Sequence, residues 1–493
     1  MIRIEDMSFN YENGEKVLNN INLTINRGEV ICLTGASGCG KTTVTRILNG
    51  TVPHLYHGNI EGTVQVNGKD IRQQSIYEIS KISGSVFQNP RSQFFCLNTT
   101  SELAFEPENY GVNPQRIKTN MNHSSEVLKM NHLLDRDIFN LSGGEKQLIA
   151  CTAIQVSGHE IIILDEPSSN LDFTTITKLR QLLEQWKSEG KTIIIAEHRL
   201  HYLIDVVDRF VVMKYGEISE IYDNGSFNAL THDNLTLLGL RSIHLDDMKP
   251  KDLNYNNSEE KLTLHNFIFN YKAKEPYALN IPKVELPQGK VTAIIGSNGS
   301  GKSTFARCLT GVERKFKGHI DINNKILKRN QRLDHVYMVF QDVNNQLFAE
   351  SVAEELRLSN NKLNDASVQS RLQQYGISDH VDRHPLSLSG GEKQRLAIAS
   401  AVETKREVLI FDEPSSGLDG QRMREISGIL NRLANQGHTV LVITHDYELL
   451  MACADEVLHL EKGCIKDQYQ MDNEYLNKLQ NFLKFKYYSN CSN

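Results

Sequence analysis

The chain has 493 residues, more than one hydrophobic core usually supports, so we expect two or more domains. A net charge of −6 and a pI near 6.3 argue against a general nucleic-acid binder, which would be basic. We expect a cytoplasmic protein with reduced thiols, because no apolar run reaches the ~18–20 residues of a membrane span, no apolar signal region opens the chain, and the eight cysteines form no Cys-x-x-Cys pair.

Strand and helix patterns alternate along the first half of the chain. Strand patterns lie at 2–4, 30–34, 161–164 and 192–195, and helix patterns at 42–48 and 174–188. The stretch over about 90–140 is polar and has a helical rhythm. This alternation predicts the α/β fold class, with a mostly parallel sheet core and a helical subdomain.

One set of motifs occurs twice, in the same order. The pairs are Gly35-Ala-Ser-Gly-Cys-Gly-Lys41-Thr42 with Gly296-Ser-Asn-Gly-Ser-Gly-Lys302-Ser303, Leu141-Ser-Gly-Gly-Glu145 with Leu388-Ser-Gly-Gly-Glu392, and Leu164-Asp-Glu-Pro167 with Phe411-Asp-Glu-Pro414. Glu166 lies 32 residues before His198, and Glu413 lies 32 residues before His445. A repeat this long indicates two copies of one domain.

The composition between and after the copies suggests the domain boundaries. We predict a first domain over 1–231, a linker over 232–258, a second domain over 259–470 and a helical tail over 471–493. The linker is rich in Asn and Asp and has little apolar periodicity. The tail could contact anionic lipid, but its apolar period favours packing on its own or the partner domain.

Each glycine-rich loop follows a strand pattern and precedes a helix pattern, which is the context of a phosphate-binding loop. Glycines let backbone N–H groups close around phosphate oxygens while a helix N-terminus points at them. Lys41 and Lys302 should reach the β- and γ-phosphates of ATP, and Thr42 and Ser303 should bind Mg²⁺. The expected loop residues are Gly35, Ser37, Gly38, Gly40, Lys41, Thr42 and Thr43, and Gly296, Asn298, Gly299, Gly301, Lys302, Ser303 and Thr304.

An acidic pair ends the same apolar strand in both copies. Asp165 and Asp412 can hold the metal, and Glu166 and Glu413 can orient or deprotonate the attacking water. A plain helix cap would also place acidic residues there. The fixed spacing to the Ser-Gly-Gly-Glu motif in both copies favours the catalytic interpretation.

The Leu-Ser-Gly-Gly-Glu motif between a phosphate loop and an Asp-Glu strand resembles the signature of ABC-type ATPases, over nearly the whole chain. In that family, two domains close head to tail, and each ATP is held between the phosphate loop of one domain and the signature of the other. The resemblance implies an intramolecular pseudo-dimer. Lys41 would share a nucleotide with Ser389 and Gly391, and Lys302 with Ser142 and Gly144.

The resemblance also implies roles for four further pairs of residues. They are Gln88 and Gln341 in the metal-sensing glutamine loop, Asp172 and Asp419 in the loop that couples the sites, His198 and His445 as switch histidines at the γ-phosphate, and Tyr11 and Tyr271 as platforms that stack on adenine. An ordinary strand aromatic is the alternative for each tyrosine.

A finer resemblance follows the glutamines. Phe87-Gln-Asn-Pro90 and the segment from Glu102 to Gly111 look like ATPases of energy-coupling-factor importers for vitamins or metal ions, although Glu106 stands where that family usually has Gly. The resemblance implies a groove for a transmembrane coupling subunit, a separate substrate-binding membrane subunit, and a place on the cytoplasmic face of the membrane. Glu102 and Glu355 are candidates for an acidic contact with an Arg of the partner, with solvated helix glutamates as the alternative.

Two other classes share the tandem layout. Tandem ATPases that act on ribosomes resemble chains with a long, charged inter-domain helix pair, whereas this linker is short and not basic, so no nucleic acid is expected. Tandem ATPases of sugar importers commonly carry a degraded motif in one half, and this chain retains both sets.

Overall fold

The computed structural model describes residues 2–12, 14, 16–169, 171–252, 260–272, 277–313, 315–323, 325–472 and 474–483. The chain divides into two compact units, which we call unit 1 (Met1–Leu245 with Asp419–Gln421) and unit 2 (Asp246–Leu418 with Arg422–Asn493). Parts of the predicted linker (253–258) and tail (484–493) lie outside the described residues. Within the described ranges, no helix is both long and apolar enough to cross a bilayer.

Unit 1 contains two sheets. The antiparallel sheet has the order β2-β1-β4-β5, and the larger sheet has the order β10-β9-β3-β8-β7-β6, parallel except for the β9–β10 pair. Its strands are β1 (Ile2–Tyr11), β2 (Lys16–Ile25), β3 (Val30–Gly35), β4 (Gly58–Val66), β5 (Lys69–Asp70), β6 (Ser83–Val86), β7 (Ile161–Asp165), β8 (Thr192–Ala196), β9 (Arg209–Lys214) and β10 (Glu217–Asp223). The apolar runs predicted as buried strands are β3, β7 and β8, and all their residues are buried.

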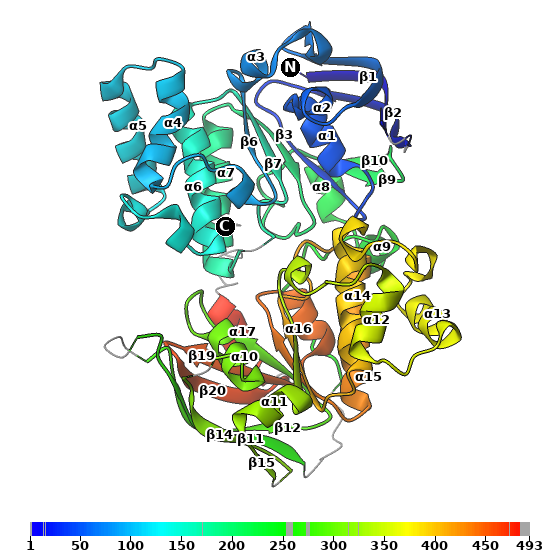
Figure 1. The fold of residues 1–493 in the computed structure, drawn as a ribbon. Helices are drawn as coiled ribbons and strands as arrows, with labels where there is room; N and C mark the ends of the chain where they lie inside the picture. The colour runs from blue at the N-terminus through cyan, green and yellow to red at the C-terminus, as the bar shows by residue number, and fades with distance from the viewer. Residues whose placement is uncertain are drawn as a thin grey trace. The chain divides into compact units, whose positions relative to one another are not determined.

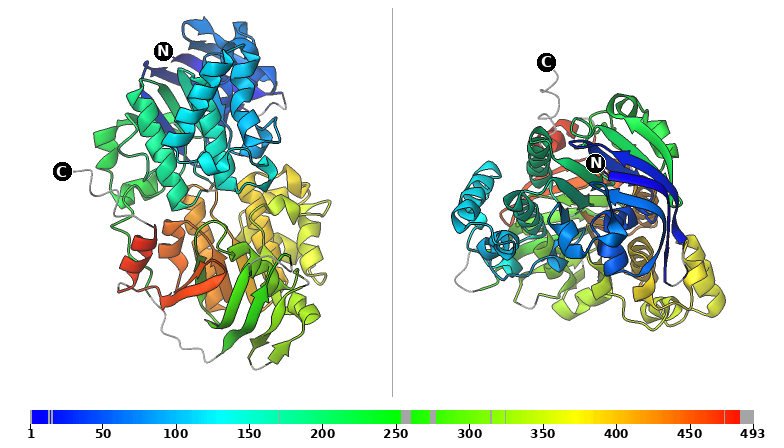
Figure 2. Two further views of the ribbon diagram at one scale, coloured as in Figure 1. Left: turned by 90° about the vertical axis from the view of Figure 1, so that its left-hand side faces the viewer. Right: turned by 90° about the horizontal axis from the view of Figure 1, so that it is seen from above.

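Helices cover both faces of the larger sheet of unit 1. The helices of unit 1 are α1 (Lys41–Leu48), α2 (Thr51–His54), α3 (Ile76–Ser80), α4 (Thr99–Asn109), α5 (Pro114–Val127), α6 (Gly143–Ser157), α7 (Phe173–Ser188), α8 (Asn224–Asn228) and α9 (His232–Leu237). Successive strand residues face opposite cores: Ile163 belongs to the core that contains Val44 of α1, and Leu164 to the core that contains Trp186 of α7. Within unit 1, α4 and α5 lie on the side away from β1 and β2 (Figure 1), and the view from above in Figure 2 shows the same separation.

Unit 2 repeats this architecture. Its sheets have the orders β12-β11-β14-β15 and β16-β17-β18-β13-β19-β20. The strands are β11 (Lys261–Phe269), β12 (Leu279–Pro287), β13 (Val291–Ile295), β14 (Lys317–Ile322), β15 (Lys325–Leu327), β16 (Val336–Val339), β17 (Val408–Asp412), β18 (Thr439–Ile443), β19 (Glu456–Glu461) and β20 (Cys464–Gln470). The helices are α10 (Lys302–Thr310), α11 (Arg329–His335), α12 (Val352–Ser359), α13 (Asp365–Gln374), α14 (Gly390–Glu403), α15 (Gly420–Asn435), α16 (Tyr447–Cys453) and α17 (Leu476–Leu483).

The predicted fold class is confirmed in both units, each of which has a mostly parallel sheet core and helices that cover it. The start of the stretch expected to be a linker contains α9. In the tail, the ring of Phe482 on α17 lies 4.2 Å from the ring of His459 on β19. The described part of the tail therefore packs on unit 2, one of the packing arrangements that the sequence favoured.

Candidate functional site

The first phosphate loop connects the end of β3 to the start of α1. Gly35 has a φ of 140°, and a Cβ at this position would lie 2.1 Å from the carbonyl oxygen of Met213 on β9. Gly40 caps α1 with a φ of 103°, and a Cβ there would lie 2.5 Å from the side chain of Leu18. Both positions favour glycine, because their backbone is left-handed, and at Gly35 a backbone oxygen also excludes a side chain.

The lysine of each loop folds back over its own loop. Lys41 Nζ donates to the carbonyl oxygens of Gly35 and Ala36, both at 3.0 Å. Lys302 Nζ donates in the same way to Gly296 at 2.7 Å and Ser297 at 3.2 Å. An ammonium group beside a helix N-terminus is a binding site for anionic phosphate oxygens.

The hydroxyl residue that follows each lysine contacts a buried carboxylate. Thr42 Oγ1 donates to Asp165 Oδ1 at 3.1 Å, and Ser303 hydrogen-bonds to Asp412. Burial, with the charge of Glu166 added, raises the pKa of Asp165 to about 7, and burial also raises the pKa of Asp412. A buried carboxylate has lost its stabilising water, and a bound cation would stabilise its charge instead. Carboxylate and hydroxyl oxygens are ligands that Mg²⁺ prefers, so these residues fit the metal implied by the resemblance to ABC-type ATPases.

Two other predicted residues of the first copy, Gln88 and His198, meet at Glu166. Its carboxylate accepts a hydrogen bond from Gln88 Nε2 at 2.6 Å, and Oε1 lies 3.5 Å from His198 Nε2. Its backbone has a φ of 44° and its N–H donates to Ala196 at the end of β8. Although burial raises the pKa of Glu166, the hydrogen bond and charge of His198, with Lys41 and Gln88, lower it overall, so the carboxylate is ionised at neutral pH.

The carboxylate of the second copy has other contacts. Glu413 Oε2 accepts hydrogen bonds from the Thr444 hydroxyl at 3.3 Å and from the His445 backbone N–H at 3.4 Å. Its Oε1 lies 3.8 Å from His445 Nε2. Gln341 follows β16 by two residues, at the position that matches Gln88. Glu413 is thus held by Thr444 and by the backbone of His445, the two residues that follow β18.

Both tyrosines lie beside the helix that follows a phosphate loop. The hydroxyl of Tyr11 lies 3.4 Å from Thr43 Oγ1, and the hydroxyl of Tyr271 lies 2.9 Å from Thr304 Oγ1. Each ring also packs edge-on against the phenylalanine two residues earlier in the chain. Their role in stacking on adenine stays a prediction.

The signature motifs begin two long helices. Ser142 caps α6 in a reciprocal capping box with Glu145, and Ser389 caps α14 in the same way with Glu392. The signature glycines Gly144 and Gly391 lie in the first turns of α6 and α14. Asp172 caps α7, and Asp419 directly precedes α15. The sharing of nucleotides between copies stays a prediction.

The expectation that Glu102 and Glu355 face a partner or solvent is wrong, because both side chains are buried. Glu102 Oε2 accepts from the backbone N–H of Phe95 at 3.0 Å and of the next residue at 2.7 Å. Glu355 Oε2 accepts from Phe348 and the next residue, both at 2.9 Å. The two phenylalanines are instead 76% and 78% exposed. The carboxylates thus hold the loops that present Phe95 and Phe348.

Replacing Glu102 by Ala should loosen this loop, because two partly buried N–H groups lose a charged acceptor. A buried donor left without an acceptor costs about 1–3 kcal/mol. We expect faster amide hydrogen exchange at Phe95 and Cys96, together with a lower unfolding midpoint. Replacement of the exposed Glu61 by Ala serves as the control. Unchanged exchange in Glu102→Ala would contradict the bracing role.

Glu106, which departs from the importer pattern, does not interrupt α4. Its Oε1 lies 3.0 Å from His159 Nε2, and its Oε2 accepts a hydrogen bond from Ser157 Oγ at 2.8 Å. The glutamate therefore ties α4 to the end of α6 and the segment after it.

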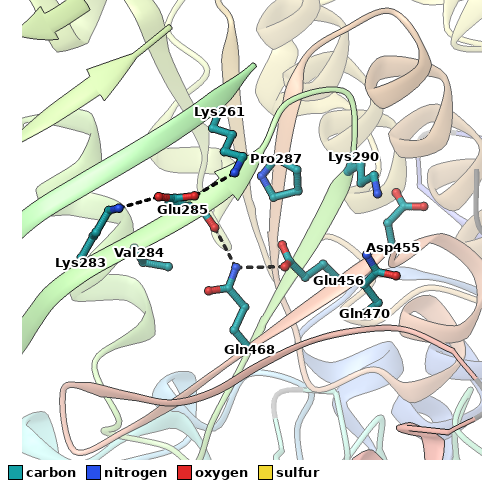
Figure 3. A pocket seen from close by; sticks show the side chains of 10 residues that line it. All are labelled: Lys261, Lys283, Val284, Glu285, Pro287, Lys290, Asp455, Glu456, Gln468 and Gln470. Carbon is teal, nitrogen blue, oxygen red and sulfur yellow. Dashed lines mark hydrogen bonds and ion pairs between the residues drawn. The ribbon is translucent and has the colours of Figure 1, made fainter. Parts of the chain in front are cut away.

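A separate hollow of about 780 Å³ lies in unit 2, near the start of β13 (Figure 3). The second phosphate loop follows the other end of that strand. In the hollow, Glu285 forms ion pairs with Lys261 at 2.9 Å and Lys283 at 2.6 Å, and these lysines lower the pKa of Glu285 to about 2. The lining also contains Lys290, Asp455 and Glu456, so lysines and carboxylates are equal in number and the hollow is a poor candidate for a phosphate site.

Comparisons with known proteins agree with the duplicated site. The family model "ABC transporter" matches residues 18–169 and 279–416. A relative from Treponema denticola, named "Putative ABC transporter ATP-binding protein", is 40% identical over 98% of this chain and 100% of its own length. Another of the same name, from Methanosarcina mazei, is 31% identical over 94% of both chains.

Solved structures share the tandem fold. An archaeal ribosome recycling factor, solved with a ribosomal stalk protein, superimposes with a TM-score of 0.68 at 23% identity, covering 97% of this chain and 92% of its own. A structure named RNase-L Inhibitor gives a TM-score of 0.67 at 23% identity, covering 97% and 93%. At this identity, the likeness shows the fold alone. With the two family matches and the close relatives, it follows that the chain belongs to the ABC transporter family and is an ATPase with two such domains in tandem.

Proposed function

We propose that this ATPase binds Mg²⁺ and ATP at two sites and powers a membrane importer of the energy-coupling-factor type. The observation that carries the proposal is that both copies retain a phosphate-loop lysine, a hydroxyl–aspartate pair and a glutamate beside a histidine. The names of the relatives support a transporter, and the sequence after each glutamine supports the importer class.

The residues of each copy divide the work. Lys41 and Lys302 exchange their loop carbonyls for the phosphate oxygens of ATP. The Thr42–Asp165 and Ser303–Asp412 pairs hold Mg²⁺, which when bound offsets charge on the phosphates. Glu166 and Glu413 orient the attacking water.

The histidine and glutamine beside Glu166 lower the pKa of its carboxylate, and their contacts with it fix its orientation. His445 lies in the matching place beside Glu413. Closure of the two copies head to tail would bring Ser389 and Gly391 to the nucleotide on Lys41, and Ser142 and Gly144 to the one on Lys302. The membrane partners would be a coupling subunit and a substrate-binding subunit, on the cytoplasmic side.

The exposed Phe95 and Phe348 are the side chains we assign to the coupling subunit, in place of Glu102 and Glu355. Each lies in the segment after the glutamine, on a loop held by a buried carboxylate. Exposed aromatic side chains on braced loops suit contact with apolar faces of partner helices.

The test is affinity purification of the full chain from detergent-solubilised membranes. We expect membrane proteins to co-purify with the wild-type chain and to be lost at least tenfold in Phe95→Ser/Phe348→Ser, with basal ATPase activity retained. Tyr215→Ser, which changes an 88% exposed aromatic in the turn between β9 and β10, is the matched control and should retain the partners. Ribosome-stimulated ATPase activity without any membrane partner would contradict the importer.

A further inference from the structure

The two copies differ in one buried segment beside the candidate active site. After β8 the chain reads Glu197-His198-Arg199, and after β18 it reads Thr444-His445-Asp446. The histidines match, but a carboxylate precedes the first and a hydroxyl precedes the second. The first copy therefore buries a carboxylate, 1% exposed, where the second has an uncharged side chain.

Glu197 connects two loops that carry site residues. Its Oε1 accepts from the backbone N–H of His198 at 2.6 Å and of Arg199 at 3.1 Å. Its Oε2 accepts from the backbone N–H of Ser168 at 3.2 Å and from the Tyr202 hydroxyl at 2.9 Å. Four donors satisfy the carboxylate, so its burial is compensated without a bound metal.

Arg199 makes a second connection between the same two loops. Its Nη1 donates to the carbonyl oxygens of Ser168 at 3.4 Å and Leu171 at 3.3 Å. Ser168 is thus held at its N–H by Glu197 and at its carbonyl by Arg199. Because Ser168 lies two residues after Glu166, these contacts fix the chain that carries Glu166 against the chain that carries His198.

The second copy connects the same two loops with different groups. Ser415, which matches Ser168, donates to Asp446 Oδ2 at 2.5 Å, and the Asp446 N–H donates to the Thr444 hydroxyl at 3.0 Å. The Thr444 hydroxyl in turn contacts Glu413 itself. The set Thr444, Asp446 and Ser415 therefore reaches the carboxylate directly, whereas Glu197 acts on Glu166 indirectly, through the backbone of His198 and of Ser168.

We propose that Glu197 is a positioning residue of the first site, acting with Arg199 and Tyr202 to hold the His198 imidazole against Glu166. The inference rests on the proposed role of Glu166 in hydrolysis. Glu197 touches no residue of the phosphate cradle, so its loss should lower kcat and leave KM for ATP unchanged. Glu197, Arg199 and Tyr202 act together. The residues at the matching positions of the second copy should be able to replace them.

The first experiment measures steady-state ATPase kinetics of full-length variants. Glu197→Ala should remove at least half of the turnover that Glu166→Gln removes, with KM for ATP changed less than about twofold. Glu166→Gln/Glu197→Ala should turn over no more slowly than Glu166→Gln, because both act on one group. The inference would be overturned if the double variant lost turnover by the product of the two single losses, or if Glu197→Ala raised KM for ATP. A Glu166→Gln variant of full activity would instead overturn the proposed function.

A second variant guards against misfolding. Glu197→Thr/Arg199→Asp/Tyr202→Leu installs the residues of the second copy, whose serine partner is already present as Ser168. We expect turnover within about threefold of the wild-type chain, whereas Glu197→Thr alone should remain as slow as Glu197→Ala. Full activity in Glu197→Thr, or no rescue by the triple variant, would contradict a positioning set.

Discussion

Replacing both Glu166 and Glu413 by Gln should lower ATP turnover at least ~100-fold while ATP affinity changes less than about threefold. The general-base contribution of a positioned carboxylate is typically ~10²–10⁴-fold. Binding depends on Lys41, Lys302 and the hydroxyl–aspartate pairs, which the substitutions leave intact. Phosphate release gives the turnover, and titration with a fluorescent ATP analogue gives the affinity.

The matched control for the double variant is Glu217→Gln, which changes an exposed carboxylate on β10. It should retain full turnover, because Glu217 lies outside the candidate site. Full activity of the double variant would remove Glu166 and Glu413 from the chemistry. A large loss of affinity would show that these carboxylates act in binding instead.

Replacing Gly35 or Gly296 by Ala should abolish ATP binding at the altered copy. A Cβ at Gly35 would lie 2.1 Å from the Met213 carbonyl oxygen, and one at Gly296 would lie 2.3 Å from that of Leu460. Because these obstacles are backbone atoms of neighbouring strands, the loop must move to admit the methyl group. Overpacking costs typically ~1–3 kcal/mol, which urea unfolding would measure.

Gly190→Ala is the control for backbone strain, since Gly190 has a φ of 73° but no atom within 4 Å of its added Cβ. It should lose only the cost of a left-handed alanine, roughly 1 kcal/mol, and should bind ATP normally. Equal loss of ATP binding in Gly190→Ala and Gly35→Ala would contradict the local explanation.

Much of the fold could be predicted because the repeat and the buried parallel strands leave strong signals. The run Ile161–Leu164 is apolar at every position, as a strand covered on both faces must be, and it became β7. The repeated spacing also located Glu166 and His198, and the family resemblance located Gln88; the structure brings these three residues together. In these cases, the chemistry constrains the sequence locally.

The contacts of Glu102 and Glu197 could not be predicted. A glutamate in the first turn of a helix is usually solvated. Glu102 is instead buried, and its carboxylate accepts a hydrogen bond from the backbone of Phe95 in the preceding loop. Glu197 precedes His198, and the repeat places Thr444 at the matching position, so the sequence gives no sign that this glutamate is buried. One of its partners, Ser168, lies 29 residues earlier in the chain, and spacing alone does not predict this contact.

The number of ATP molecules held by one chain tests the central claim most directly. Native mass spectrometry of Glu166→Gln/Glu413→Gln with Mg²⁺ and ATP should find two ATP molecules on a single monomeric chain, because each copy carries its own phosphate loop and signature, and together they form two sites. Two ATP molecules found only on paired chains, or a single ATP per chain at saturation, would contradict a tandem ATPase that works through its own two copies.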